Sequence, residues 1–138
     1  MNNFVIDASF AVKWLLWEDG TDKALEVLDR LLWFYAPDLF LMEIDAVLTK
    51  KVRKRELDAA EALIKYEQAR TLPFKLISYS KIDRFAIQLA TEFSITLYDA
   101  TYLATAIDYD AVLYTADRKL VSGLSSTPFA KYAKYIWE

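Results

Sequence analysis

The sequence predicts an α/β protein whose parallel sheet is covered by helices on both faces. Short apolar segments alternate with longer segments of helical periodicity, and the connections between strands exceed hairpin length. A chain of 138 residues with 55% hydrophobic residues suits one compact domain, residues 1–138. Two glycines and three prolines leave no linker-like stretch, so we expect no second domain.

Strands and helices are expected to alternate along the whole chain. The predicted strands are short apolar segments, at 4–6, 74–78, 111–115 and 134–138. The predicted helices repeat apolar residues at helical spacing, at 9–17, 21–34, 39–53, 55–70, 81–93, 99–109 and 117–124. Folds of this class bind their ligands outside the carboxyl ends of the strands.

The composition excludes several kinds of chemistry. The chain has no cysteine and no histidine, which removes disulfides, thiolate metal sites, and thiol or imidazole catalysis. The excess of 20 acids over 17 bases gives a net charge of −3, so any nucleic acid would be held locally rather than by a broadly basic surface. No segment is typical of a membrane span or a secretory signal, and we expect a cytoplasmic protein.

Four acids stand at positions that suggest a metal site. Asp7 and Asp117 follow predicted strands, and Asp99 stands at the start of a predicted helix, just before its apolar stretch Ala100 to Ile107. Glu43 lies within a helix, on its apolar arc, where an unpaired charge is costly. Clustered carboxylates repel one another unless a divalent cation joins them. Ligand sets made only of oxygen suit Mg²⁺ or Mn²⁺ rather than zinc or copper.

Each of these acids also has a purely structural interpretation. Asp7, Asp99 and Asp117 each precede a predicted helix, where aspartate is a favoured N-cap. Ser9 could equally cap its helix, and Glu43 could reach out to water. These alternatives do not explain why an acid beside the first buried strand occurs together with an acid on a core-facing helix stripe.

Four segments, in order, resemble the PIN domain of VapC-type toxins. They are VIDAS near the start, PDLFLMEIDAVL on a helix, LYDATYLATA, and VLYTADRKL on a late strand. The ordered set extends from Asp7 to Asp117, and it implies a three-layer α/β/α sandwich on a central parallel sheet and metal-dependent cleavage of RNA. One departure is Ala46, where the family often carries an asparagine three positions after the glutamate.

The resemblance also implies which residues form the site. The family's four acids correspond to Asp7, Glu43, Asp99 and Asp117, and its companion hydroxyls to Ser9 and Thr115. Our hypothesis is that Asp7, Asp99 and Asp117 are ligands of Mg²⁺ or Mn²⁺, and that Glu43 completes this site or holds a second ion. The two hydroxyls would orient carboxylates or waters.

Contacts with RNA and with other proteins are expected elsewhere on the chain. The candidates for RNA phosphate contacts are Lys50, Lys51 and Arg53 in the run KKVRKR, and Arg118 and Lys119 beside Asp117. A solvated helix end explains the KKVRKR run equally well. The resemblance implies a homodimer and a cognate antitoxin protein, and the aromatic excess also suggests a partner surface.

Two other kinds of protein fit the sequence less well than a ribonuclease does. A phosphatase of the haloacid dehalogenase type needs a second acid two residues after the first, where this chain has Ser9. A receiver domain needs an acidic pair near its start. The stronger alternative is a catalytically silent PIN-like module that binds RNA or protein, and metal-dependent degradation of single-stranded RNA would distinguish the two.

Overall fold

The computed structural model describes residues 3–138. Five strands within this range form one parallel sheet. The strands are β1 (Asn3–Ile6), β2 (Phe34–Pro37), β3 (Phe74–Ile77), β4 (Ala111–Thr115) and β5 (Ala133–Tyr135). Their order in the sheet is β3-β2-β1-β4-β5, and every neighbouring pair is parallel. The first strand therefore lies at the centre, with Val5 paired to Tyr35 of β2 and to Leu113 of β4.

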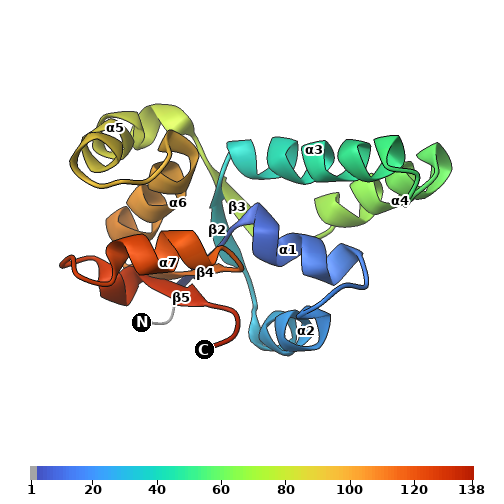
Figure 1. Ribbon diagram of the computed structural model, residues 1–138, viewed down its shortest axis with the longest axis horizontal. Helices are drawn as coiled ribbons and strands as arrows, with labels where there is room; N and C mark the ends of the chain where they lie inside the picture. Colours follow the sequence, from blue (N-terminus) through green and yellow to red (C-terminus); the bar gives the residue numbers. More distant parts are fainter. Residues whose placement is uncertain (1–2) are drawn as a thin grey trace.

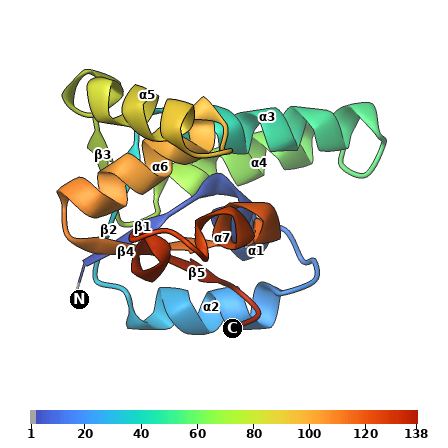
Figure 2. The same cartoon turned by 60° about the vertical axis from the view of Figure 1, so that its left-hand side comes forward.

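Helices cover both faces of this sheet. They are α1 (Ala8–Leu15), α2 (Thr21–Arg30), α3 (Leu39–Arg53), α4 (Ala59–Arg70), α5 (Asp83–Glu92), α6 (Leu97–Asp108) and α7 (Arg118–Leu124). Helices α1 to α4 lie on one side of the sheet and α5 and α6 on the other (Figure 1). A second view places α5 and α6 above the sheet and α2 below it (Figure 2). The expected three-layer α/β/α architecture is confirmed.

The core lies between the central strands and the helices that cover them. Val5 and Ile6 are consecutive in β1 and both fully buried, as expected for a parallel strand with helices on each face. Helix α6 contacts β1, β2 and β4 as well as α5, and each of its residues from Ala100 to Ala106 is buried. Its alanines allow this close packing. Within residues 3–138, no helix is long and apolar enough to cross a membrane.

The expected helix over 21–34 is wrong at its carboxyl end. Helix α2 stops at Arg30, and Phe34–Pro37 is instead the strand β2. Apolar residues continue at helical spacing through Leu31 and Leu32, but Leu32 is 90% exposed, whereas Phe34 is fully buried in the sheet. A buried strand of four residues has no periodicity of its own that would reveal it.

The helix that carries Asp99 begins earlier than expected. Helix α6 starts at Leu97, and its N-cap is Thr96, whose hydroxyl accepts a hydrogen bond from the Asp99 backbone N–H at 3.1 Å. Asp99 therefore lies in the first helical turn and is not itself a cap. Its carboxylate still gains from the positive end of the helix dipole.

Candidate active site

Four helices begin at the edge of the sheet where the central strands end. Helix α1 follows β1 directly, α3 follows β2, and α7 follows β4. Helix α6 also begins at this edge, although it covers the other face of the sheet from α1 and α3 (Figure 1). Asp7 is the N-cap of α1 and Asp117 is the N-cap of α7. The topology thus brings acids from distant parts of the sequence to one edge of the sheet, as expected for a parallel sheet.

Asp7 is the most deeply buried acid of the site, with 5% of its surface exposed. Its Oδ1 accepts hydrogen bonds from the Phe10 backbone N–H at 3.0 Å and from the Ser9 hydroxyl at 2.7 Å. Burial raises the pKa of Asp7 to about 7, although hydrogen bonds from Thr115, Ser9 and Phe10 lower it. The charge of Asp99 adds a smaller upward shift to this pKa. The carboxylate therefore lies where its negative charge is poorly compensated.

The hydroxyls of Ser9 and Thr115 link the start of α1 to the end of β4. Ser9 Oγ accepts a hydrogen bond from the Ala116 backbone N–H at 3.1 Å and lies 3.4 Å from Thr115 Oγ1. Thr115 is fully buried, and its Oγ1 accepts from the Asp117 backbone N–H at 2.9 Å. Ser9 does not cap α1, because Asp7 does. The hydroxyls fix the backbone that presents Asp7 and Asp117.

Asp99 is the electrostatic centre of the acidic group. Burial raises the pKa of Asp99, the charge of Asp117 raises it further, and the hydrogen bond to Thr96 lowers it. The charge of Asp99 in turn raises the pKa of Asp7 and of Glu43. All four acids therefore belong to one electrostatic neighbourhood.

Glu43 faces the same site from the second turn of α3. It is half-buried, and its Oε1 accepts a hydrogen bond from the Tyr102 hydroxyl at 2.6 Å. Burial raises the pKa of Glu43, the Tyr102 hydrogen bond lowers it, and Asp99 raises it. Sequence reasoning did not assign Tyr102 a role, although its position three residues after Asp99 places both on one face of α6.

The donor chemistry of these residues suits a hard divalent cation. Carboxylate and hydroxyl oxygens are the ligands that Mg²⁺ and Mn²⁺ prefer, and the shared upward pKa shifts of Asp7, Glu43 and Asp99 reflect burial and repulsion that a cation would offset. Throughout residues 3–138, no three acidic side chains are spaced closely enough to hold one ion between them as they stand. The residues fit such an ion by chemistry and charge.

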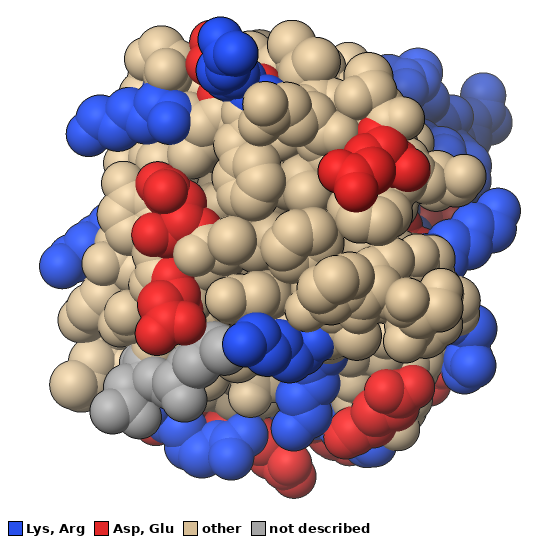
Figure 3. Space-filling model, turned by 90° about the vertical axis from the view of Figure 1, so that its left-hand side faces the viewer, with Lys and Arg blue, Asp and Glu red and all other residues tan. Residues whose placement is uncertain are grey.

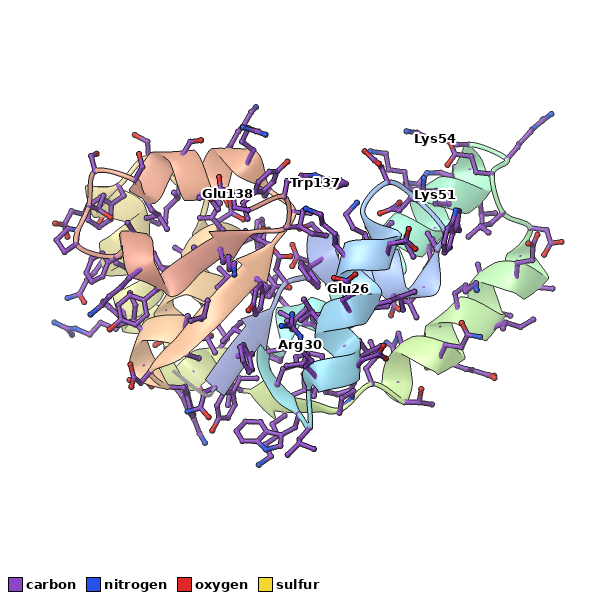
Figure 4. All side chains as sticks on the ribbon, turned by 90° about the horizontal axis from the view of Figure 1, so that it is seen from below. Glu26, Arg30, Lys51, Lys54, Trp137 and Glu138 are labelled. Carbon is purple, nitrogen blue, oxygen red and sulfur yellow. The ribbon has the colours of Figure 1, made fainter. Side chains whose placement is uncertain are left out.

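The candidate RNA-contacting residues lie in two different places. Arg118 and Lys119 immediately follow Asp117, and the Arg118 guanidinium lies 4.9 Å from the Tyr135 ring centre. The KKVRKR run occupies the other end of α3, where Figure 4 shows Lys51 and Lys54. At the helical rise, this run begins about 10 Å along the axis from Glu43. Lys51 Nζ is paired with Glu56 at 2.8 Å.

Asp45 lies two residues after Glu43 on α3, but it does not join the acidic site. Its two carboxylate oxygens accept hydrogen bonds from Arg70 of α4 at 2.6 and 2.7 Å. This bidentate pair joins α3 to α4 and holds Asp45 on the polar side of its helix. Its exclusion from the acidic site follows from that pairing.

Comparison with known proteins identifies the class to which this fold and site belong. Residues 4–122 match the PIN domain family, and the chain belongs to that family. A similar curated protein is Ribonuclease VapC3 of Pyrobaculum aerophilum, which is 29% identical over 118 residues. The match covers 84% of this chain and 90% of the relative.

Solved structures share the fold over nearly the whole chain. A toxin-antitoxin complex from Klebsiella pneumoniae contains a chain with a TM-score of 0.69 and 18% identity, and the match covers 99% of both chains. VapC20 of Mycobacterium tuberculosis, described as a sarcin-ricin loop cleaving toxin, has a TM-score of 0.69 and 13% identity. That match covers 87% of this chain and 94% of the other. At these identities the likeness shows the fold.

Proposed function

We propose that this protein is a metal-dependent endoribonuclease that hydrolyses RNA phosphodiester bonds, and that it is the toxin of a type II toxin-antitoxin pair. The observation that carries the proposal is that four acids converge on one edge of the sheet: Asp7, Glu43, Asp99 and Asp117. The charge of Asp99 raises the pKa of Asp7 and of Glu43. The charge of Asp117 raises the pKa of Asp99. Membership of the PIN domain family and the similarity to Ribonuclease VapC3 support it.

Each residue has a distinct part in the proposed reaction. Asp7, Asp99 and Asp117 would hold Mg²⁺ or Mn²⁺, and Glu43 would complete the site or accept a proton from the attacking water. Such ions supply a nucleophilic hydroxide at neutral pH and neutralise phosphate charge. Ser9 and Thr115 would keep the carboxylates of Asp7 and Asp117 in place through the hydrogen bonds described above. Basic side chains nearby, Arg118 and Lys119 first, would bind the RNA phosphates.

The test is cleavage of single-stranded RNA by purified protein with Mn²⁺ or Mg²⁺, against the same protein in EDTA. We expect cleavage with either ion and none in EDTA. Asp7→Asn and Asp99→Asn should each lose activity. Full activity in either variant would overturn the assignment of these acids, and metal-dependent binding of RNA without cleavage would favour the silent RNA-binding module.

We also propose a homodimer and a separate antitoxin partner in the cytoplasm, where cellular RNA is available. The antitoxin is supported by the likeness to a chain of a toxin-antitoxin complex. The dimer is supported by an apolar hollow of about 500 Å³ at the N-terminal ends of α3 and α6, where Met42 is 76% and Tyr98 64% exposed. The neighbouring face over α5 and α6 is largely uncharged (Figure 3).

A further inference from the structure

Tyr102 is a buried tyrosine that links the acid-bearing elements of the site. Only 2% of its surface is exposed, and it lies one turn after Asp99 on α6. Its hydroxyl donates to Glu43 Oε1 of α3 at 2.6 Å. Burial raises the pKa of Tyr102, and the charges of Glu43 and Asp7 raise it further. Tyr102 therefore lies beside Glu43 and near Asp7, on the helix that carries Asp99.

The direction of the hydrogen bond between Tyr102 and Glu43 is fixed by its chemistry. The phenol has one proton to donate, and an ionised carboxylate has none. The single phenol proton is then directed to the Glu43 carboxylate, which can only accept when it is ionised. A hydrogen bond to a charged acceptor is stronger than a neutral one. Tyr102 is therefore an oriented donor and not simply an aromatic ring that fills the core.

This hydrogen bond restricts a flexible side chain. Glu43 is half-buried, and without a partner its carboxylate would turn toward water to avoid the cost of burial. Tyr102 holds Oε1, which leaves Oε2 for water, metal or substrate. We propose that Tyr102 is a positioning residue that holds the Glu43 carboxylate in the acidic site, an inference that rests on the proposed metal-dependent nuclease function.

The first experiment compares Tyr102→Phe with the wild type. The variant keeps the ring that packs in the core and removes only the hydroxyl. We expect the Mn²⁺ dissociation constant, measured by calorimetry, to rise by roughly 10- to 100-fold, the usual effect of losing a partner of a metal-binding side chain. We expect kcat to fall with KM nearly unchanged. Tyr109→Phe, at the C-cap of the same helix, is the control and should match the wild type.

A double-mutant cycle tests whether Tyr102 acts through Glu43. In a Glu43→Ala background, adding Tyr102→Phe should cause no further loss of Mn²⁺ affinity or kcat, because the group that the hydroxyl holds is absent. A structural role for Tyr102 would give equal losses in both backgrounds. That result would overturn the proposal, as would wild-type Mn²⁺ affinity in Tyr102→Phe.

Glu43→Asp gives a second test that leaves the core untouched. It keeps the charge but shortens the side chain by one methylene, so that the carboxylate no longer reaches Tyr102. We expect a loss of Mn²⁺ affinity similar to that of Tyr102→Phe, and this variant keeps the proposal falsifiable if Tyr102→Phe does not fold. Wild-type affinity in Glu43→Asp would overturn the proposal. An inactive Asp7→Asn alongside a fully active Tyr102→Phe would refute the role of Tyr102 alone, whereas an active Asp7→Asn would refute the nuclease site.

Discussion

Asp7 is a helix cap and is also buried close to another acid. It caps α1 through the Phe10 N–H, a role that aspartate performs well at a helix N-terminus. It is also buried near Asp99, whose charge raises its pKa. The capping interpretation of Asp7 and Asp117 is therefore correct as geometry, and it does not exclude the metal-ligand hypothesis, since one carboxylate has two oxygens. A substitution that keeps the cap and removes the charge separates the two roles.

We expect Asp7→Asn to fold and to lose its response to metal. Asparagine is nearly as good a cap as aspartate, and the variant lacks the charge that is repelled by Asp99, so without metal it should melt no lower than the wild type. Mn²⁺ at 100 times its dissociation constant should stabilise the wild type by about 2.7 kcal/mol, which raises the melting temperature by several degrees. Calorimetric melting curves with and without Mn²⁺ check both points. A wild-type curve indifferent to Mn²⁺ would leave Asp7 as a cap only.

At the scale of the elements, the α3–α4 hairpin is joined by the bidentate pair of Asp45 and Arg70. Both side chains are about one-third exposed, with 35% and 31% of the side chain accessible. We expect Asp45→Ala and Arg70→Ala each to lower the free energy of unfolding by roughly 1 kcal/mol, with a coupling of at most that size. Urea unfolding of the single and double variants measures this. Cleavage should be unchanged, and an inactive Asp45→Ala would instead assign Asp45 to the active site.

The two basic segments should differ in their effect on RNA cleavage. Arg118 and Lys119 follow Asp117 directly, whereas Lys50 and Arg53 lie at the far end of α3. We expect Lys119→Ala to raise KM for RNA more than Lys50→Ala does, and to reduce the slope of log affinity against log salt by about 0.7 for a lost single-strand phosphate contact. Affinity measured across a salt series checks this. A larger effect at Lys50 would place the RNA along α3 instead.

The fold was largely predictable because long helices and most strands have distinct patterns. The parallel arrangement followed from alternating apolar strands and amphipathic helices. The strand β2 was missed because Phe34–Pro37 follows the amphipathic helix α2 without a break in the apolar periodicity. What makes it a strand is the pairing of its Tyr35 with Val5 of β1, a contact between residues distant in sequence. The start of α6 was misplaced because the Thr96 cap was not recognised.

The site was predictable in part for a different reason. Asp7, Asp99 and Asp117 were selected because they stand at the ends of predicted strands and helices, and Glu43 because it lies on an apolar helix face. The PIN domain resemblance then assigned all four to one site. Tyr102 has an ordinary core position in the sequence, and only the approach of α3 to α6 reveals its bond to Glu43. Contacts between elements that are distant in sequence carry no local signal.

At the scale of the whole molecule, the exposed apolar hollow predicts self-association. We expect the wild type to be a dimer in solution and Met42→Lys to be a monomer, because a charge in a buried apolar interface is costly. Met42 is 76% exposed, so this substitution should not lower the melting temperature by a large amount. Light scattering at micromolar concentration gives both masses, with Leu63→Lys, on the exposed face of α4, as the matched control. A monomeric wild type would refute the dimer.

The placement of the first strand at the centre of the sheet has a consequence for folding. Strand β1 pairs with β4, so Val5 must find Leu113, which is made long after it. Native contacts between such distant segments slow folding. Asp7 therefore meets Asp117 only after β4 and Asp117 have been made, and until then a growing chain has no assembled acidic site. A protein that cuts RNA would in this way be inactive until β4 and Asp117 have emerged from the ribosome.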